Sequence, residues 1–179
     1  FSDGDYRNKG TLIKCNPAIK QESDRLALLQ AVRDDRIDII ATDHAPHLLD
    51  EKARPYAQAP SGLPLVQDAL LVLLELVQQG QLTLEQVVAK SSHRVAELFA
   101  IRDRGYLREG YHADLVLVDP LTPTEVTRTK VLSKCGWSPF EGHRFTHSIH
   151  TTLVNGQILY RRGQPVADIT ALPLQFRRD

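Results

Sequence analysis

Short apolar runs alternate with helical patterns over the first hundred residues. Residues 11–15 and 37–41 are apolar or β-branched stretches that stop at polar residues, and we expect each to form a buried strand. Between them, leucines and Val32 recur at helical spacing after Ser23, which predicts a helix with Ser23 as its N-cap. Strand, helix and strand at this spacing predict a βαβ unit with right-handed parallel pairing.

A long loop and an apolar helix follow. Residues 44–63 carry no periodic pattern, and loops of that length in compact domains usually cover or bind something. Residues 64–79 predict a buried helix, with Pro64 in its first turn and Gly80 as the residue that ends it.

Two further helical segments are expected after this helix. Thr83 and Gln86 have the spacing of a capping box, which predicts a helix start. Ser91 and Ser92 interrupt the pattern, and we expect them to cap a further turn that runs through Leu98.

From Gly105 onward, glycines separate short runs of β type. Residues 113–118 and 149–154 are candidate strands. Asn155-Gly156 lies between the second of these and residues 157–160, which is the strongest hairpin signal in the chain. The second half is therefore expected to be largely β.

Composition excludes several classes of protein. The 179 residues include 22 basic and 22 acidic side chains, so the net charge is zero, whereas nucleic-acid and anionic-membrane surfaces need clustered positive charge. There is no signal-peptide pattern, and the apolar run 70–74 is far too short to span a bilayer. Cys15 and Cys135 are too few for a disulfide scaffold, which favours a cytoplasmic protein with reduced thiols. The lack of any Met fits a chain that begins within a longer gene product.

The strongest chemical signal is the run Ala41-Thr42-Asp43-His44-Ala45-Pro46-His47, closed by Lys52. Asp43 follows the strand expected at residues 37–41, and α/β barrels keep their catalytic groups at such strand ends. A carboxylate held beside histidines suits metal binding or proton transfer. The alternative is an ordinary turn or N-cap aspartate.

This run resembles the second signature of dihydroorotases, which belong to the amidohydrolase superfamily. Four other segments resemble parts of that family in the same order, so that the resemblance extends from about residue 3 to about residue 165. These segments are Cys15-Asn16-Pro17-Ala18-Ile19-Lys20, Ala59-Pro60-Ser61-Gly62-Leu63-Pro64-Leu65-Val66-Gln67, Ser133-Lys134-Cys135-Gly136-Trp137-Ser138-Pro139-Phe140-Glu141-Gly142 and Thr152-Leu153-Val154-Asn155-Gly156. In the first of them, Ala18 and Lys20 replace a Pro and an Arg of the family pattern.

The resemblance implies an α/β fold made of the last two strand-helix units of a TIM-type (β/α)8 amidohydrolase barrel plus part of a small β-sandwich domain. A complete barrel needs about 250 residues. The chain therefore resembles the C-terminal portion of a dihydroorotase. We expect residues 1–104 to belong to the barrel and residues 105–179 to the composite sandwich domain.

The resemblance also implies a reaction and a cofactor. Dihydroorotases interconvert N-carbamoyl-L-aspartate and dihydroorotate in de novo pyrimidine biosynthesis, with one or two zinc ions. Asp43 holds the family position that ligates metal and acts as general acid and base. Asn16 and His47 match substrate-binding positions, and Ser61 and Gly62 match a loop that presents backbone groups to the pyrimidine ring. For Asn16 and Gly62, a plain turn role is the alternative.

The remaining histidines predict no metal site. His147 and His150 would point to opposite faces of one strand, so a single ion could not bind both. The chain has no His-x-His pair, and Asp43 alone does not make a zinc site, which needs three or four ligands. We therefore expect this chain by itself to be inactive and to bind zinc weakly.

Two other functions are considered. Another cyclic amidohydrolase, such as an allantoinase or hydantoinase, is disfavoured by the Ala-Pro-His that leads to His47. A non-catalytic scaffold subunit for a transcarbamoylase would tend to lose the signature residues, whereas Asp43, His47 and Asn16 are present. As partners we expect a small-molecule substrate, together with a second copy of the chain or the missing N-terminal half.

Overall fold

The computed structural model describes residues 1–166 and 172–177. Its contacts divide the chain into two compact units, each made of separated segments. Unit 1 comprises residues 1–37, 41–72 and 125–144, and unit 2 comprises residues 38–40, 73–124 and 145–179. The predicted domain division at residues 104 and 105 stays a prediction.

Unit 1 is built from short helices and long loops around a small apolar core. Its longest complete helix is α2 (Glu22–Arg33), and α4 (Ala69–Gln78) belongs to it as far as Val72. The other helical segments are η1 (Asp3–Asp5), α1 (Tyr6–Lys9), η2 (Gly10–Ile13), α3 (Leu49–Lys52) and η4 (Arg128–Lys130). Its buried apolar side chains are Ile13, Val32, Ala59, Leu63, Leu71, Val126 and Trp137.

The strands expected at residues 11–15 and 37–41 are not formed, so the βαβ prediction is wrong for the described structure. Residues 10–13 are the 3₁₀-helix η2, and residues 37–41 are half-buried or exposed without regular structure. The Ile37 N–H donates to the Ala31 carbonyl oxygen at 3.2 Å, and the Ile40 N–H donates to that of Lys90 at 3.0 Å. The backbone groups of these segments thus have partners in helices, whereas a strand requires a ladder to a neighbouring strand.

Helix α2 begins earlier than predicted. Its N-cap is Gln21, not Ser23, and the Asp24 carboxylate accepts a hydrogen bond from the Gln21 N–H at 3.1 Å. Asp24 and Glu22 also place negative charge in the first turn, where the helix dipole favours it. The preference of Ser for N-caps was outweighed by this arrangement of carboxylates.

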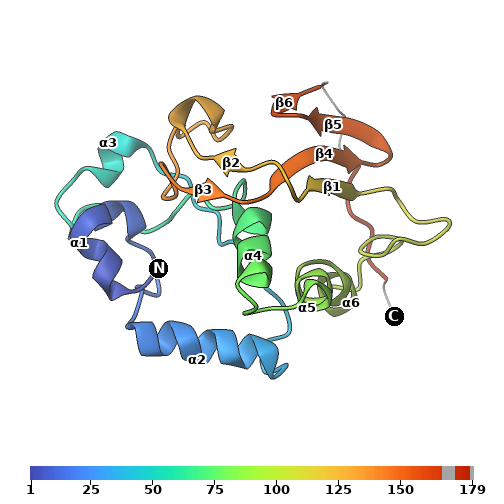
Figure 1. Cartoon of the computed structure of the whole chain (residues 1–179), viewed down its shortest axis with the longest axis horizontal. Coiled ribbons are helices and arrows are strands. Elements are labelled where there is room, and N and C mark those ends of the chain that lie inside the picture. Colours follow the sequence, from blue (N-terminus) through green and yellow to red (C-terminus); the bar gives the residue numbers. More distant parts are fainter. Residues whose placement is uncertain (167–171, 178–179) are drawn as a thin grey trace. The chain divides into compact units, whose positions relative to one another are not determined.

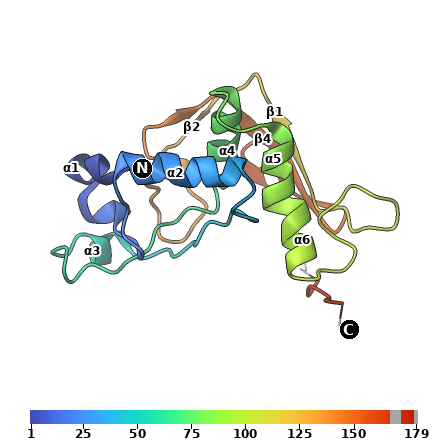
Figure 2. The same cartoon turned by 90° about the horizontal axis from the view of Figure 1, so that it is seen from below.

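The helices of unit 2 follow the predicted caps in part. Helix α5 (Leu84–Val88) starts with the predicted capping box, in which Thr83 Oγ1 accepts from the Gln86 N–H. A π-helical turn, η3 (Ala89–His93), joins it to α6 (Arg94–Leu98), and Figure 2 shows the three as one continuous rod. The two serines therefore do not cap a new helix. Ser91 Oγ donates to the Val87 carbonyl oxygen, one turn earlier, at 2.7 Å.

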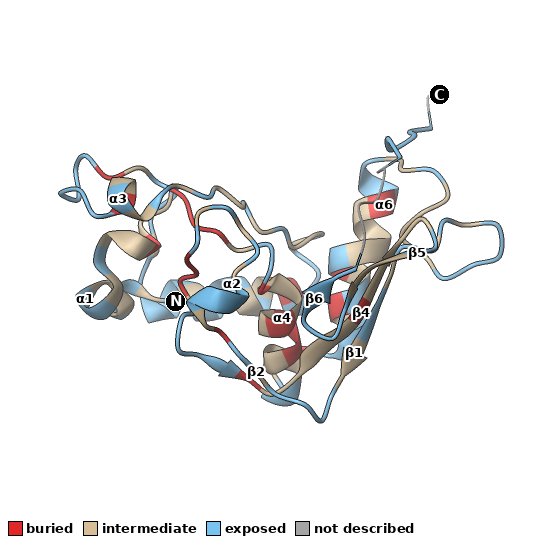
Figure 3. Cartoon of the chain, turned by 90° about the horizontal axis from the view of Figure 1, so that it is seen from above, coloured by how far each residue is buried: buried red, intermediate tan, exposed pale blue. Residues whose placement is uncertain are grey.

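Helix α4 was expected from residue 64, but its first helical residue is Ala69. The apolar character predicted for it is confirmed, since Leu71, Leu73 and Leu74 are buried (Figure 3). Gly80 follows its end with a φ of 67°, a left-handed conformation that glycine adopts without strain.

A four-stranded antiparallel sheet forms the β part of unit 2, in the order β1-β4-β5-β6 (Figure 1). The predicted hairpin is confirmed: Asn155 and Gly156 have φ values of 52° and 79°, as expected in a type I′ turn. The strands are β1 (Leu115–Asp119), β4 (Ser148–Val154), β5 (Gln157–Arg161) and β6 (Gln164–Pro165). Two short strands, β2 (Thr124–Glu125) and β3 (Arg144–Phe145), form a separate sheet.

No helix within residues 1–166 and 172–177 has the length and apolar character needed to cross a membrane.

Candidate active site

Lys52 binds three backbone carbonyls, from two segments of unit 1, at one buried point. Its side chain is fully buried, and Nζ donates to the carbonyl oxygens of Lys14 at 3.1 Å, Pro60 at 3.0 Å and Gly62 at 2.9 Å. Burial lowers the pKa of the Lys52 ammonium, because desolvation disfavours its charged form. The three carbonyl acceptors stabilise that charge, as a buried charge requires.

Gly62 lies so close to residues 45–47 that no side chain fits. Its φ is 144°, and a Cβ there would lie 2.6 Å from Ala45 Cβ and 2.7 Å from the Ala45 carbonyl oxygen. The same atom would lie 3.0 Å from Cδ2 of the His47 ring. The Gly62 N–H donates to the Lys14 carbonyl oxygen at 2.9 Å. A plain turn role does not account for this close approach.

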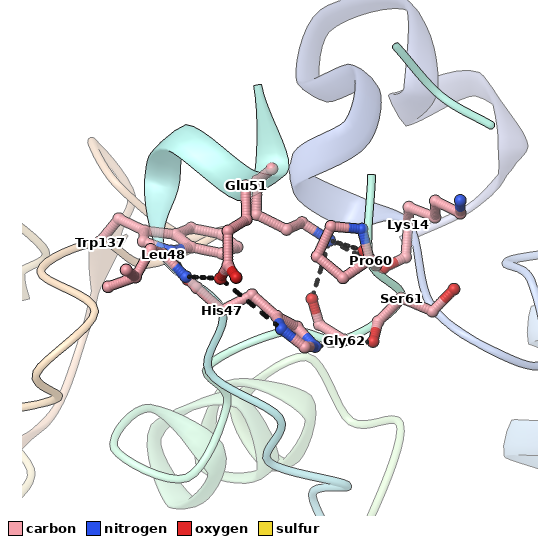
Figure 4. A network of polar contacts seen from close by, with 9 residues as sticks. Lys14, His47, Leu48, Glu51, Pro60, Ser61, Gly62 and Trp137 are labelled. Atoms are coloured by element: carbon pink, nitrogen blue, oxygen red, sulfur yellow. Dashed lines mark hydrogen bonds and ion pairs between the residues drawn. The ribbon is translucent and has the colours of Figure 1, made fainter. Parts of the chain in front are cut away.

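His47 faces the loop on which Ser61 lies (Figure 4). Its Nε2 is 3.1 Å from the Ser61 carbonyl oxygen, and its Nδ1 is 3.9 Å from Oε2 of Glu51. The same Glu51 oxygen accepts from the Leu48 N–H at 2.8 Å, at the start of α3. The His47 carbonyl oxygen accepts from Nε1 of Trp137 at 2.8 Å. The imidazole is therefore held from its backbone as well as from its ring.

The segment around Trp137 is fixed by a second buried contact. Ser138 Oγ donates to Oδ2 of Asp68 at 2.7 Å, and both side chains are buried. Burial raises the pKa of the Asp68 carboxyl, and the Ser138 hydrogen bond partly opposes that shift. Asp68 thus links the loop after residue 63 to the segment that contacts His47.

Asp43 is exposed, and its backbone has a φ of 45°. Aspartate is one of the few residues that tolerate this left-handed region. The described residues provide no hydrogen-bond or ion-pair partner for its carboxylate. The carboxylate is therefore open to a ligand from outside the described part of the chain.

Asn16 and Ser61 are exposed at the edges of the same group of segments. Asn16 precedes a cis bond to Pro17, and it lies two residues after the Lys14 carbonyl that Lys52 and Gly62 share. Of the predicted site residues, the structure brings His47, Ser61 and Gly62 into contact. Asn16 is tied to them through the backbone, and within the described part of the chain Asp43 forms no hydrogen bond to any of them.

Of the residues expected at the site, only Asp43 is a candidate zinc ligand. Within residues 1–166 and 172–177 there is no group of three or more His, Cys, Asp or Glu residues placed to hold a metal. A zinc site needs three or four ligands in fixed geometry. The adjacent His44 is not free for this role in the conformation seen, because its Nδ1 accepts from the Val66 N–H at 3.2 Å.

Two residues of this region were missed by the sequence analysis. Lys52 was noted as the end of the signature but received no role, and Glu51 was not singled out. For Glu51 the available signal was its spacing of four residues from His47, because residues four apart lie close together in a helical turn. The three carbonyl partners of Lys52 come from residues 8 to 38 positions away, and no local pattern indicates them.

Comparison with known proteins places this arrangement in a family. Residues 11–159 match the model of the amidohydrolase family, and the chain belongs to that family. It is 42% identical to the dihydroorotase of Clostridium acetobutylicum over 161 residues, which are 89% of this chain and 38% of that protein. It is 41% identical to the dihydroorotase of Halobacterium salinarum over 143 residues, 80% of this chain and 34% of that protein.

Solved structures share the fold. The L-hydantoinase (dihydropyrimidinase) of Arthrobacter aurescens superposes with a TM-score of 0.88 at 25% identity, over 94% of this chain and 38% of that one. The D-hydantoinase (dihydropyrimidinase) of Thermus sp. gives 0.80 at 23% identity, over 89% and 36%. The chain thus spans less than two fifths of the length of each of these relatives.

Proposed function

We propose that this chain is the C-terminal portion of a dihydroorotase, which interconverts N-carbamoyl-L-aspartate and dihydroorotate. The identity of 42% to a dihydroorotase over 89% of the chain supports this proposal. The observation that carries it within the molecule is the contact of His47 with the Ser61–Gly62 loop, to which the Asn16 segment is tied. These are the residues that the resemblance assigns to the substrate.

The substrate roles follow from the chemistry of these groups. His47 would bind the substrate carboxylate through Nε2, which would exchange the Ser61 carbonyl oxygen for a charged acceptor. A hydrogen bond to a charged group contributes about 1.5–3 kcal/mol, so the exchange is favourable. Asn16 would hydrogen-bond a polar group of the substrate. Ser61 and Gly62 would present backbone groups to its ring.

Asp43 would act as general acid and base. Its carboxylate would accept a proton from the attacking water and return that proton to the ring nitrogen as the amide C–N bond breaks. Zinc, when bound, would lower the pKa of a water and polarise the amide carbonyl. Asp43 would be one of its ligands, and the others would come from the part of such an enzyme that this chain does not span.

The finer fold assignment belongs to the same proposal. Residues 1–104 would form the last two strand-helix units of a TIM-type barrel, and residues 105–179 would form part of a β-sandwich domain. We also propose that the enzyme is cytoplasmic, and that a second copy or the N-terminal part of the enzyme is its partner.

The test is the substrate preference of the protein at its full natural length. We expect turnover of dihydroorotate, and of N-carbamoyl-L-aspartate in the reverse direction, at a kcat/KM at least about a hundredfold above that for hydantoin or allantoin. A preference for hydantoin or allantoin would overturn the proposal in favour of another cyclic amidohydrolase. No turnover by folded, zinc-supplemented protein would favour the scaffold function.

The 179-residue chain provides a second test. It should show no dihydroorotate hydrolysis above a metal-free control, because its described residues offer one ligand where zinc needs several. Activity of the purified chain that depends on zinc would contradict the assignment of the missing ligands.

A further inference from the structure

The Lys52 ammonium has no donor left for a substrate. An ammonium group offers three N–H donors, and three carbonyl oxygens lie within 3.1 Å of Nζ. The side chain is also fully buried. Any role of Lys52 in the reaction must therefore act through the backbone that it binds.

The carbonyls of residues 60–62 point alternately to the two sides of the loop. Pro60 and Gly62 direct their oxygens to Lys52, while the oxygen between them, that of Ser61, lies 3.1 Å from His47 Nε2. Extended chains direct successive backbone groups to opposite sides in this way. Lys52 thus binds carbonyls on one side of the loop. The Ser61 carbonyl, on the other side, is turned toward His47 (Figure 4).

Lys52 also links the Asn16 segment to that loop. The Lys14 carbonyl oxygen accepts from both Lys52 Nζ and the Gly62 N–H. One ammonium group therefore links the two segments that carry Asn16 and Ser61. The Gly62 N–H also joins them, as do hydrogen bonds from Lys14 Nζ to the Tyr56 and Ala59 carbonyl oxygens at 2.6 Å.

Packing alone does not require a charge at this position. Replacing a buried charge by an apolar side chain of similar volume is often neutral or stabilising. A methionine of similar length would fill the space of the lysine stem but would remove the donor from the Pro60 and Gly62 carbonyl oxygens, while the Lys14 oxygen would keep the Gly62 N–H as its donor. The ammonium, unlike an apolar side chain, holds these three carbonyl oxygens around a single point.

We propose that Lys52 is a positioning residue for substrate binding: it sets the placement of the Ser61–Gly62 loop and the Asn16 segment without contacting the substrate. The inference rests on the proposed function for its kinetic consequence. Its structural consequence, the order of the loop, is independent of that function.

The experiment compares two buried lysines. Lys52→Met removes the three donors, and Lys52→Gln keeps an amide donor that is one bond shorter. Lys90→Met is the matched control, because Lys90 is 1% exposed and lies in unit 2, away from this loop in the sequence. Each variant of the full-length protein is measured by hydrogen–deuterium exchange of the peptide 59–65 and by kcat and KM for dihydroorotate.

The expected result is selective for Lys52. In Lys52→Met, exchange of the peptide 59–65 should accelerate at least about tenfold, because the Pro60 and Gly62 carbonyls of this loop, and the Lys14 oxygen that accepts from the Gly62 N–H, lose the ammonium that orders them. KM should rise at least about tenfold, with a smaller fall in kcat, since the loss is one of substrate binding. Lys52→Gln should give exchange rates and KM values between those of the unaltered protein and Lys52→Met. If the methionine variant does not fold, the same measurements on Lys52→Gln test the proposal.

Two results would overturn the proposal. One is unchanged exchange of peptide 59–65 in the folded Lys52 variants. The other is an equal change of KM and kcat in the Lys52 and Lys90 variants, which would indicate general destabilisation. If the unaltered protein does not act on dihydroorotate, the proposed function fails by itself, and the exchange measurement alone decides the role of Lys52.

Discussion

Replacing Gly62 by alanine is expected to destabilise the 179-residue chain by about 2–6 kcal/mol. The φ of 144° is a conformation that L-residues rarely adopt, at a cost of about 1–3 kcal/mol. The new Cβ would also lie 2.6 Å from Ala45 Cβ and 2.7 Å from the Ala45 carbonyl oxygen. Overpacking of this kind costs about 1–3 kcal/mol more, because the Ala45 oxygen belongs to backbone and cannot swing aside.

Gly142→Ala is the matched control for this measurement. Gly142 lies in unit 1 with a φ of 82°, and a Cβ there would meet nothing within 4 Å. This variant should therefore lose only a backbone contribution comparable to that at Gly62, about 1–3 kcal/mol. The two variants then differ by the overpacking cost of about 1–3 kcal/mol. Urea unfolding followed by circular dichroism should give Gly62→Ala the lower midpoint, by at least about 0.3 M for a denaturant dependence of about 1–3 kcal/mol per molar. Equal midpoints for the two variants would refute the close contact of Gly62 with residues 45–47.

The other predictions concern Asp43, His47, Asp68 and the association of the chain. In the full-length enzyme, Asp43→Asn should lower kcat at least about a hundredfold; near-normal turnover by a folded, zinc-loaded variant would exclude an acid–base role. His47→Ala should lower kcat/KM for dihydroorotate about tenfold or more, and a loss of zinc by elemental analysis would show that His47 is a ligand instead. Burial raises the pKa of Asp68, so its contribution to the unfolding free energy is fully present below its unfolded pKa of about 3.9 and is lost as the pH rises through the folded value. Between pH 4 and pH 7, unfolding midpoints of the unaltered chain should therefore fall relative to those of Asp68→Asn, and parallel pH profiles would contradict the shift. The isolated chain should self-associate at low micromolar concentration, because Leu26 and Leu28 on α2 and Leu117 on the edge strand β1 are at least half exposed; a monomer in analytical ultracentrifugation would show otherwise.

Features that depend on neighbouring residues were predictable from the sequence. The Thr83 capping box and the Asn155-Gly156 hairpin are confirmed, because their stabilising contacts lie within three or four residues. Gly80 likewise ends α4 through its own backbone conformation. In each case the local chemistry leaves few other structures open.

Features that depend on distant partners were not predictable in the same way. The runs at residues 11–15 and 37–41 have strand composition, but their backbone groups bond to helices and loops. Likewise, Lys52 gave no sign that it would be buried, because its acceptors are contributed by two other segments. The signature indicated where the site lies, whereas the contacts that hold it required the structure.

The hydrogen bond from Trp137 to the His47 carbonyl spans 90 residues of sequence. Unit 1 therefore cannot reach its final form until its third segment, residues 125–144, has been synthesised. This segment follows residues 73–124 of unit 2. At about 5–20 residues per second on a ribosome, the interval between the synthesis of His47 and that of Trp137 is roughly 5–18 s. During this interval the loop at residues 44–63 lacks its contact with Trp137, while the helices α5 and α6 already have their local hydrogen bonds available. The order of synthesis thus completes the candidate active site after α5 and α6 and before the sheet whose strands β4, β5 and β6 follow Trp137.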